Sequence, residues 1–210
     1  MNAKSPSRYA RLRVLLWTLV GIVVLGLAVR WGWQNMDDRA PPTALESASA
    51  LIAGKFALVD HAGNAVTDET YRGKWLVVFF GYTFCPDVCP TTLTTVSDAI
   101  DRLGARASQA QPLFITVDPQ RDTVQRMAEY VAAFDAGIVG LSGTPDQIDT
   151  AARNFRAYYA KVGEANDPDY LMDHSALLYI LDPDGRFAAY VSTGDDVEAI
   201  EAKLRGLIDE

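Results

Sequence analysis

Cysteine and histidine are scarce in this sequence, with two of each among 210 residues. A four-cysteine zinc site is therefore impossible, a site of two cysteines and two histidines would use all of them, and no multi-disulfide scaffold can form. The sequence lacks a Walker A loop, a G-x-S-x-G elbow and an H-E-x-x-H motif, which argues against the enzymes that depend on them. A formal net charge of −8 argues against a nucleic-acid-binding protein, which normally has a basic surface.

The charges that are present are distributed unevenly along the chain. Residues 1–29 hold four basic residues and no acidic one, and residues 14–29 carry no charge at all. As a helix this uncharged stretch is about 24 Å long, and Trp31 and Trp33 extend it toward the roughly 30 Å of a bilayer core. A cleaved signal peptide is the alternative, but no small-x-small cleavage site follows. We expect a basic cytoplasmic N-terminus (1–13), a transmembrane anchor (14–33), a linker (34–50) and a globular domain (51–210).

The same charge distribution predicts an orientation. Basic residues flanking a membrane helix stay in the cytoplasm, so the domain is expected on the other side. We therefore predict a single-pass protein of the bacterial inner membrane with its domain in the periplasm. Two cysteines would there meet an oxidising compartment.

Strand and helix patterns alternate through residues 51–210. Continuous apolar runs bounded by turn residues predict buried strands, and capping residues predict helix starts, such as Asp122 with Gln125 and Thr144 with Gln147. The order predicts an α/β fold, a mixed sheet with helices on both faces. The predicted elements are a hairpin (56–67), strands (75–82, 112–117, 138–141, 175–181, 187–191) and helices (90–103, 122–134, 144–158, and one capped by Asp195).

Cys85 and Cys89 lie where the strand 75–82 leads into the helix predicted from Pro90. Pro90 argues against a helical Cys89, so we expect the pair in the loop that enters the helix. Two sulfurs four residues apart can share a metal ion or form a disulfide, and a helix N-terminus favours thiolate. A purely structural disulfide closing so short a loop would stabilise little. Metal binding and redox chemistry both remain open on the spacing alone.

His174 favours a metal site. It stands just before the strand 175–181, and antiparallel pairing of that strand with 75–82 would bring His174 to the cysteine loop. Two thiolates and one imidazole form a soft set that suits Cu(I), or Cu(II) with a further weak ligand, although zinc also accepts it. His61 falls in a predicted turn and is interpreted as a surface residue.

Three ordered blocks resemble the SCO/SenC family of copper-binding assembly proteins. The blocks are GYTFCPDVCPTTL (81–93), TVDPQRDT (116–123) and DYLMDHS (169–175), and the segments 54–60 and 71–82 also match. The resemblance covers about residues 51–208 and implies a thioredoxin-like fold with copper, as Cu(I) and Cu(II), bound by Cys85, Cys89 and His174. It also implies a role at the dinuclear copper centre of cytochrome c oxidase, delivering copper to it or reducing its cysteines.

Neighbouring residues of these blocks have two interpretations each. Asp118, Arg121 and Asp122 either support the site or dock a partner, or they belong to a loop that caps the following helix, and for Asp122 we favour the helix-capping role. Asp173 either orients the imidazole or is a solvated acid, and Met172 is interpreted as core packing.

The expected function is a membrane-anchored copper chaperone and thiol reductant. Its expected partners are the copper-binding subunit of cytochrome c oxidase and other copper chaperones or thiol reductants. The main alternative is an enzyme, a membrane-anchored thiol–disulfide oxidoreductase, although the spacing is C-x3-C and not the C-x2-C of thioredoxin-like catalysts. A thiol peroxidase and a redox or copper sensor are further alternatives.

Overall fold

The computed structural model describes residues 17–26, 30, 52–134, 136–163 and 169–209, and it divides into two units, Met1–Thr43 and Ala44–Glu210. In the first unit, residues 17–26 form a helix whose side chains are exposed. Among the described residues, no helix combines the length and the apolar character needed to cross a membrane. Most of the predicted N-terminus, anchor and linker (1–13, 14–33 and 34–50) lies outside the described residues, so these assignments stay predictions.

The second unit is built on a mixed sheet of seven strands in the order β2-β1-β5-β4-β3-β8-β9. β3 pairs with β4 in parallel, as β4 does with β5, whereas β3–β8, β8–β9, β1–β2 and β1–β5 are antiparallel. The predicted mixed sheet is confirmed. Its strands are β1 (Ala57–Asp60), β2 (Ala65–Thr67), β3 (Trp75–Gly81), β4 (Ala110–Thr116), β5 (Val139–Ser142), β8 (Leu177–Leu181) and β9 (Phe187–Ser192).

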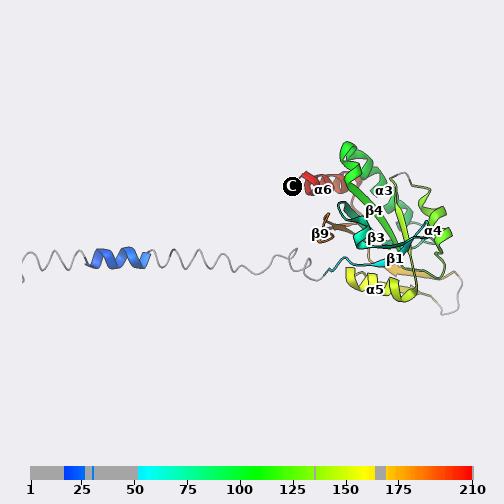
Figure 1. The fold of residues 1–210 in the computed structure, drawn as a ribbon, viewed down its shortest axis with the longest axis horizontal. Coiled ribbons are helices and arrows are strands. Elements are labelled where there is room, and N and C mark those ends of the chain that lie inside the picture. The colour runs from blue at the N-terminus through cyan, green and yellow to red at the C-terminus, as the bar shows by residue number, and fades with distance from the viewer. Residues whose placement is uncertain (1–16, 27–29, 31–51, 135, 164–168, 210) are drawn as a thin grey trace, which may run out of the picture. The chain divides into compact units, whose positions relative to one another are not determined.

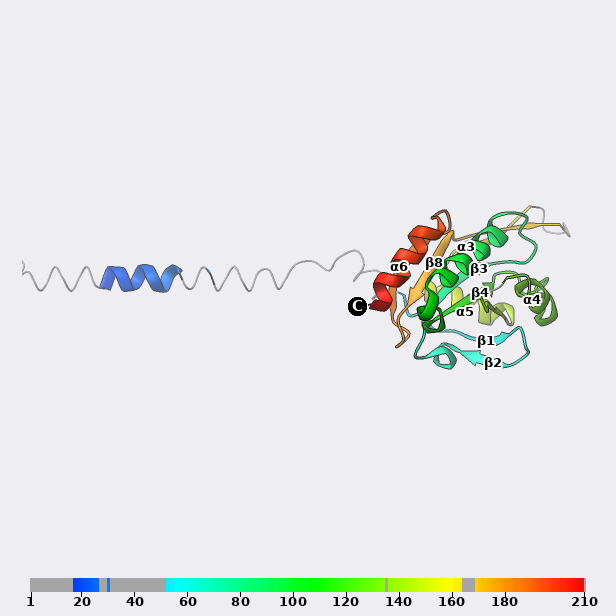
Figure 2. The ribbon, with the colours of Figure 1, turned by 90° about the horizontal axis from the view of Figure 1, so that it is seen from above.

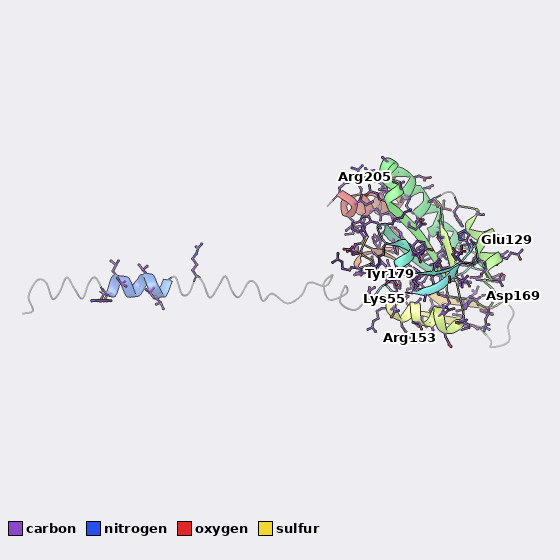
Figure 3. All side chains as sticks on the ribbon, in the orientation of Figure 1. Lys55, Glu129, Arg153, Asp169, Tyr179 and Arg205 are labelled. Carbon is purple, nitrogen blue, oxygen red and sulfur yellow. The ribbon has the colours of Figure 1, made fainter. Side chains whose placement is uncertain are left out.

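Helices cover both faces of this sheet. Figure 1 shows α3 and α6 on one side of the strands and α5 on the other, and Figure 2 shows α3 and α6 lying beside each other. In Figure 3, Tyr179 lies within the body, while Arg153 and Glu129 extend outward from α5 and α4. The helical elements are η1 (Asp68–Tyr71), α3 (Val88–Arg102), η2 (Gly104–Gln109), α4 (Val124–Val131), α5 (Pro145–Phe155) and α6 (Val197–Asp209).

The central strand β3 is buried from Leu76 onward because it is covered on both faces. Successive side chains of a strand point to opposite faces. Phe80 packs edge-on against Phe155 of α5, with ring centroids 5.3 Å apart, whereas Phe79 packs against Phe114 and His174. The Phe79 face of β3 is therefore the one that carries the histidine.

Several predicted boundaries are wrong. α3 begins at Val88 and includes Cys89, because a proline in the first turn removes only an N–H that has no helical partner. The N-cap of α4 is Thr123 and not Asp122, since the Thr123 hydroxyl accepts the N–H of Arg126. Before α6, the carboxylate of Asp196, and not that of Asp195, accepts an N–H of the first turn.

One element was missed entirely, a two-stranded sheet separate from the main one. It consists of β6 (Tyr159–Val162) and β7 (Leu171–His174), which pair antiparallel. The predicted helix 144–158 ends earlier, at Phe155, and its C-cap Arg156 takes the left-handed conformation that often closes helices. The chain that follows turns into β6, and β7 then leads into β8.

Candidate metal centre

The two cysteines lie at the junction between β3 and α3. Both are free thiols; Cys89 is fully buried, in the first turn of α3, and Cys85 is half-buried in the loop before it. The Cys89 N–H donates to Cys85 Sγ at 3.4 Å. The first turn of a helix has N–H groups without helical partners, so the Cys85 sulfur takes the place of a capping acceptor. This contact brings the two sulfurs close together.

His174 reaches the cysteines from the end of β7. Its Nε2 lies 3.5 Å from Cys89 Sγ, and its Nδ1 is 3.3 Å from the carbonyl oxygen of Ser175. The imidazole is held edge-on by the rings of Phe79 and Tyr82, with centroids 5.8 and 6.0 Å away. The predicted antiparallel pairing of β3 with β8 is confirmed, and it brings the chain before β8 to the cysteine end of β3.

The donor atoms of Cys85, Cys89 and His174 all lie within 4.8 Å of one another, which is close enough to surround one ion. Among the residues that the structure describes, this is the one group of three or more cysteine, histidine or acidic side chains with such spacing. Two sulfurs and an imidazole nitrogen are a soft donor set of the kind that Cu(I) prefers. The residues therefore fit a copper ion.

Burial shifts the pKa values of Cys89 and His174 in the metal-free protein. It raises the pKa of the Cys89 thiol, the hydrogen bond with the backbone of Tyr82 opposes the rise, and the nearby Cys85 and Asp122 add to it. The thiol is therefore favoured at Cys89, in place of the thiolate expected at a helix N-terminus. Burial also lowers the pKa of His174, although the hydrogen bond to Ser175 and the charge of Asp173 oppose this shift. The lowered pKa keeps the imidazole neutral near pH 7. A bound cation would supply the charge that lets the thiols release their protons.

A second polar cluster borders the site. Asp118 accepts a hydrogen bond from the Tyr170 hydroxyl at 2.7 Å and forms an ion pair with Arg121. The Arg121 guanidinium carbon lies 3.6 Å from the ring centroid of Tyr170 and 4.6 Å from that of Phe84, the residue before Cys85. Tyr170 and Phe84 were not singled out from the sequence. An aromatic residue in the sequence does not by itself indicate a cation–π contact. The contact appears only when the fold brings both rings to the Arg121 guanidinium.

The other residues considered from the sequence differ in burial and in their contacts. Asp173 is exposed, whereas Met172 packs against the core, as predicted. His61, interpreted from the sequence as a surface residue, is half-buried. Its Nδ1 accepts the N–H of Gly140 in β5 at 3.1 Å. Asp122 is fully buried, and its carboxylate accepts hydrogen bonds from Thr83 and Thr116.

Known proteins resemble this chain in sequence and in structure. The sequence profile of the SCO1/SenC family matches residues 45–209. The mitochondrial SCO2 homologue of Bos taurus is 39% identical over 199 residues, which cover 93% of this chain and 74% of that protein. Arabidopsis thaliana ScoI, solved with copper bound, is 38% identical with a TM-score of 0.70, covering 75% of this chain and 98% of that one. Bradyrhizobium japonicum ScoI, also with copper bound, is 43% identical with a TM-score of 0.68, covering 74% and 98%.

These comparisons confirm the thioredoxin-like fold of the domain and copper as the expected metal. They contradict the predicted location in a bacterial inner membrane with a periplasmic domain, because the curated relatives include mitochondrial proteins from cattle, Arabidopsis and human. The reason for the error is physical. The distribution of basic residues predicts on which side of a membrane a domain lies, and it carries no information on which membrane that is.

Proposed function

This chain belongs to the SCO1/SenC family, and from that premise we propose that it is a copper chaperone and thiol reductant for the dinuclear copper centre of cytochrome c oxidase. Assembly of that oxidase is the role described for the Sco family. The observation that carries the proposal is the set of three donor atoms from Cys85, Cys89 and His174 within 4.8 Å of one another. In this proposal all three side chains are copper ligands.

The chemistry of the three side chains supports transfer as well as binding. Cys85 is half-buried and gives a partner's ligands a way to reach the ion, while Cys89 and His174 hold it from inside. The two thiols are also a two-electron reductant. By thiol–disulfide exchange they convert a disulfide of a target protein into two thiols, pass on both protons, and become a Cys85–Cys89 disulfide themselves. That disulfide removes two ligands, so reduction of the target and release of copper are linked.

The free thiols also favour a second candidate, a thiol–disulfide oxidoreductase that does not depend on copper. Cys89 lies in the first turn of α3 and Cys85 in the loop just before it, where Cys85 is partly accessible. An enzyme of this kind would turn over disulfide substrates equally well with and without His174, because the imidazole is not required for exchange.

An anaerobic titration of Cu(I) into the reduced full-length chain, against a competing chelator, tests the proposal. We expect one tightly bound ion, markedly weaker binding by the His174→Ala variant, and loss of tight binding by Cys85→Ser and Cys89→Ser. The His61→Gln variant is the matched control, because it changes the other histidine and keeps an acceptor for Gly140. Equally weak binding by the wild type and His174→Ala would discard the copper site and leave the oxidoreductase.

The partner follows from the same chemistry. We propose that the acceptor is the copper-binding subunit of cytochrome c oxidase, and that other copper chaperones or thiol reductants load and reduce this chain. Mixing the copper-loaded chain with the reduced, copper-free soluble domain of that subunit should move copper to the subunit. The Cys89→Ser variant, treated in the same way, should transfer none.

Membrane attachment through residues 14–33 is part of the proposal and is supported by the uncharged run of residues 14–29. We expect the full-length chain to stay with membranes in alkaline carbonate. A chain that starts at Ala44 should be released under the same conditions.

A further inference from the structure

Asp122 has a buried carboxylate whose hydrogen bonds lead directly to the cysteine loop. Its Oδ2 accepts the N–H of Thr83 at 3.0 Å and the hydroxyl of Thr116 at 2.6 Å, while its Oδ1 accepts the hydroxyl of Thr83 at 2.6 Å. Asp122 is fully buried. The burial raises its pKa and the three hydrogen bonds oppose that rise. Burying a carboxylate costs free energy, so its position needs a structural reason. Capping of α4 is not that reason, because Thr123 caps this helix.

The main sheet and its loops hold Asp122 in place from two sides. Its N–H donates to the carbonyl of Asp118 at 2.9 Å, and its own carbonyl accepts the hydroxyl of Ser142, at the end of β5, at 2.8 Å. Thr83, by contrast, belongs to the loop that leaves β3, two residues before Cys85. The carboxylate therefore connects a rigid part of the fold to the beginning of the metal-binding loop.

The loop between Thr83 and Cys89 has few other attachments of this kind. Cys85 N–H donates to the carbonyl of Tyr82 at 3.3 Å, and Cys85 Sγ accepts the N–H of Cys89. Both of these bonds lie within the loop and the first turn of α3. The two Thr83 bonds to Asp122 connect the loop to a segment 39 residues away, and the Thr83 hydroxyl also accepts a longer hydrogen bond from Arg126 Nε at 3.4 Å.

We propose that Asp122 is a positioning residue for the metal site, acting through Thr83. It holds the beginning of the loop so that Cys85 stays against the first turn of α3 and Cys89 stays buried beside His174. The role as a site for copper rests on the proposed function, whereas the positioning of the thiols is a property of the metal-free protein. Preorganised ligands bind an ion more tightly because less conformational freedom is lost on binding.

The test compares two threonines that bond to the same carboxylate. Thr83→Val removes the loop hydroxyl, which donates to Asp122 and accepts from Arg126. Thr116→Val is the matched control, because it removes the β4 hydroxyl, which donates to Asp122 and accepts the N–H of Asp118. Thr83→Ser keeps the loop hydroxyl and should restore wild-type behaviour. The readout is the rate at which iodoacetamide labels Cys89 in the reduced, metal-free full-length chain, followed by mass spectrometry, with urea unfolding measured for each variant.

Labelling of Cys89 should rise roughly tenfold or more in Thr83→Val, since a hydrogen bond to a buried charged group changes a local opening equilibrium by about that factor. Thr116→Val and Thr83→Ser should stay within about twofold of the wild type. Asp122→Asn removes the negative acceptor and should behave as Thr83→Val does. Unchanged labelling in Thr83→Val, or an equal increase in Thr116→Val at equal loss of stability, would overturn the proposal.

Copper affinity, measured on the same variants, separates this inference from the proposed function. Cu(I) binding that weakens in Thr83→Val and recovers in Thr83→Ser supports both. If Cys89 labelling responds as expected while the wild type binds no copper tightly, the positioning of the thiols stands and the chaperone proposal fails. If copper binds tightly while labelling does not respond, Asp122 is not a positioning residue.

Discussion

At the scale of single residues, Gly81 shows how closely the parts of the site approach one another. It is the last residue of β3, directly beneath the first turn of α3. A Cβ added here would lie 2.8 Å from Cys89 Sγ and 2.8 Å from a ring carbon of Phe114. Both neighbours are fully buried and have no room to move away. Glycine is required for close packing, and not for an unusual backbone conformation.

Gly81→Ala is therefore expected to displace the Cys89 sulfur and to weaken Cu(I) binding. The crowding should also cost about 1–3 kcal/mol of folding free energy, measured by urea unfolding of the metal-free chain. Gly206→Ala is the control, because its Cβ would meet nothing within 4 Å on α6, and alanine should stabilise that helix by about 0.5–1 kcal/mol. Wild-type copper affinity in Gly81→Ala would contradict the crowding seen at Cys89.

At the scale of elements, the β6–β7 sheet carries His174 without belonging to the main sheet. Two strands alone are marginally stable, so contacts with the body must hold the histidine in place. Tyr170, just before β7, provides such contacts through its hydrogen bond to Asp118 and its stacking on Arg121. Burial raises the pKa of Tyr170 to about 12, and the bond to Asp118 adds to the rise.

This pKa predicts a loss of stability at high pH. A tyrosine with a pKa near 10 in the unfolded chain and about 12 in the folded protein binds its proton more tightly in the folded state. Its stabilisation is complete below pH 10 and is lost as pH rises from 10 to 12. Burial raises the pKa of Tyr71 to about 12 as well, so the absorbance of tyrosinate near 295 nm should show a late titration step with contributions from several tyrosines. The amplitude of that step should fall by one tyrosine in Tyr170→Phe and stay unchanged in Tyr158→Phe, at an exposed position. A late step of unchanged amplitude in Tyr170→Phe would refute the assignment.

At the scale of the whole domain, the three proposed ligands come from segments 85 residues apart in the chain. Cys85 and Cys89 follow the centre of the main sheet, and His174 ends a strand of the separate sheet. A ligand that bridges such segments binds the folded state far better than the unfolded one, because unfolding separates its donors. Copper binding should therefore be coupled to the stability of the entire domain.

Bound Cu(I) is expected to raise the unfolding free energy by about 2–3 kcal/mol when free Cu(I) is one hundred times the dissociation constant. The increase should disappear when a Cu(I) chelator is added. Cys89→Ser should show no increase under the same anaerobic conditions. Thermal unfolding of the reduced chain, with and without Cu(I), measures the effect. An equal shift in Cys89→Ser would mean that copper stabilises the fold from another site.

The parts that sequence predicted well are those that depend on local patterns. The apolar run of 75–82, the capping box at Thr144 and the alternation of strands and helices were each correct because hydrophobic periodicity and caps act over a few residues. The errors lie where local signals compete. Asp122 is as good a cap as Thr123 by residue type, and tertiary hydrogen bonds assign it to Thr83 instead.

By itself, the sequence determined the alternation of strands and helices along the chain apart from β6 and β7, the C-x3-C motif at a strand-to-helix junction, and the donor types that make a soft metal site. Only the tertiary structure decided that His174 lies 3.5 Å from Cys89, that it arrives on a second sheet, and that Tyr170, Asp122 and Gly81 surround the site. The physical reason is the range of the forces. Hydrophobic periodicity and helix capping depend on residues that are close together in the sequence. Burial and contacts between distant segments form only when the chain has packed.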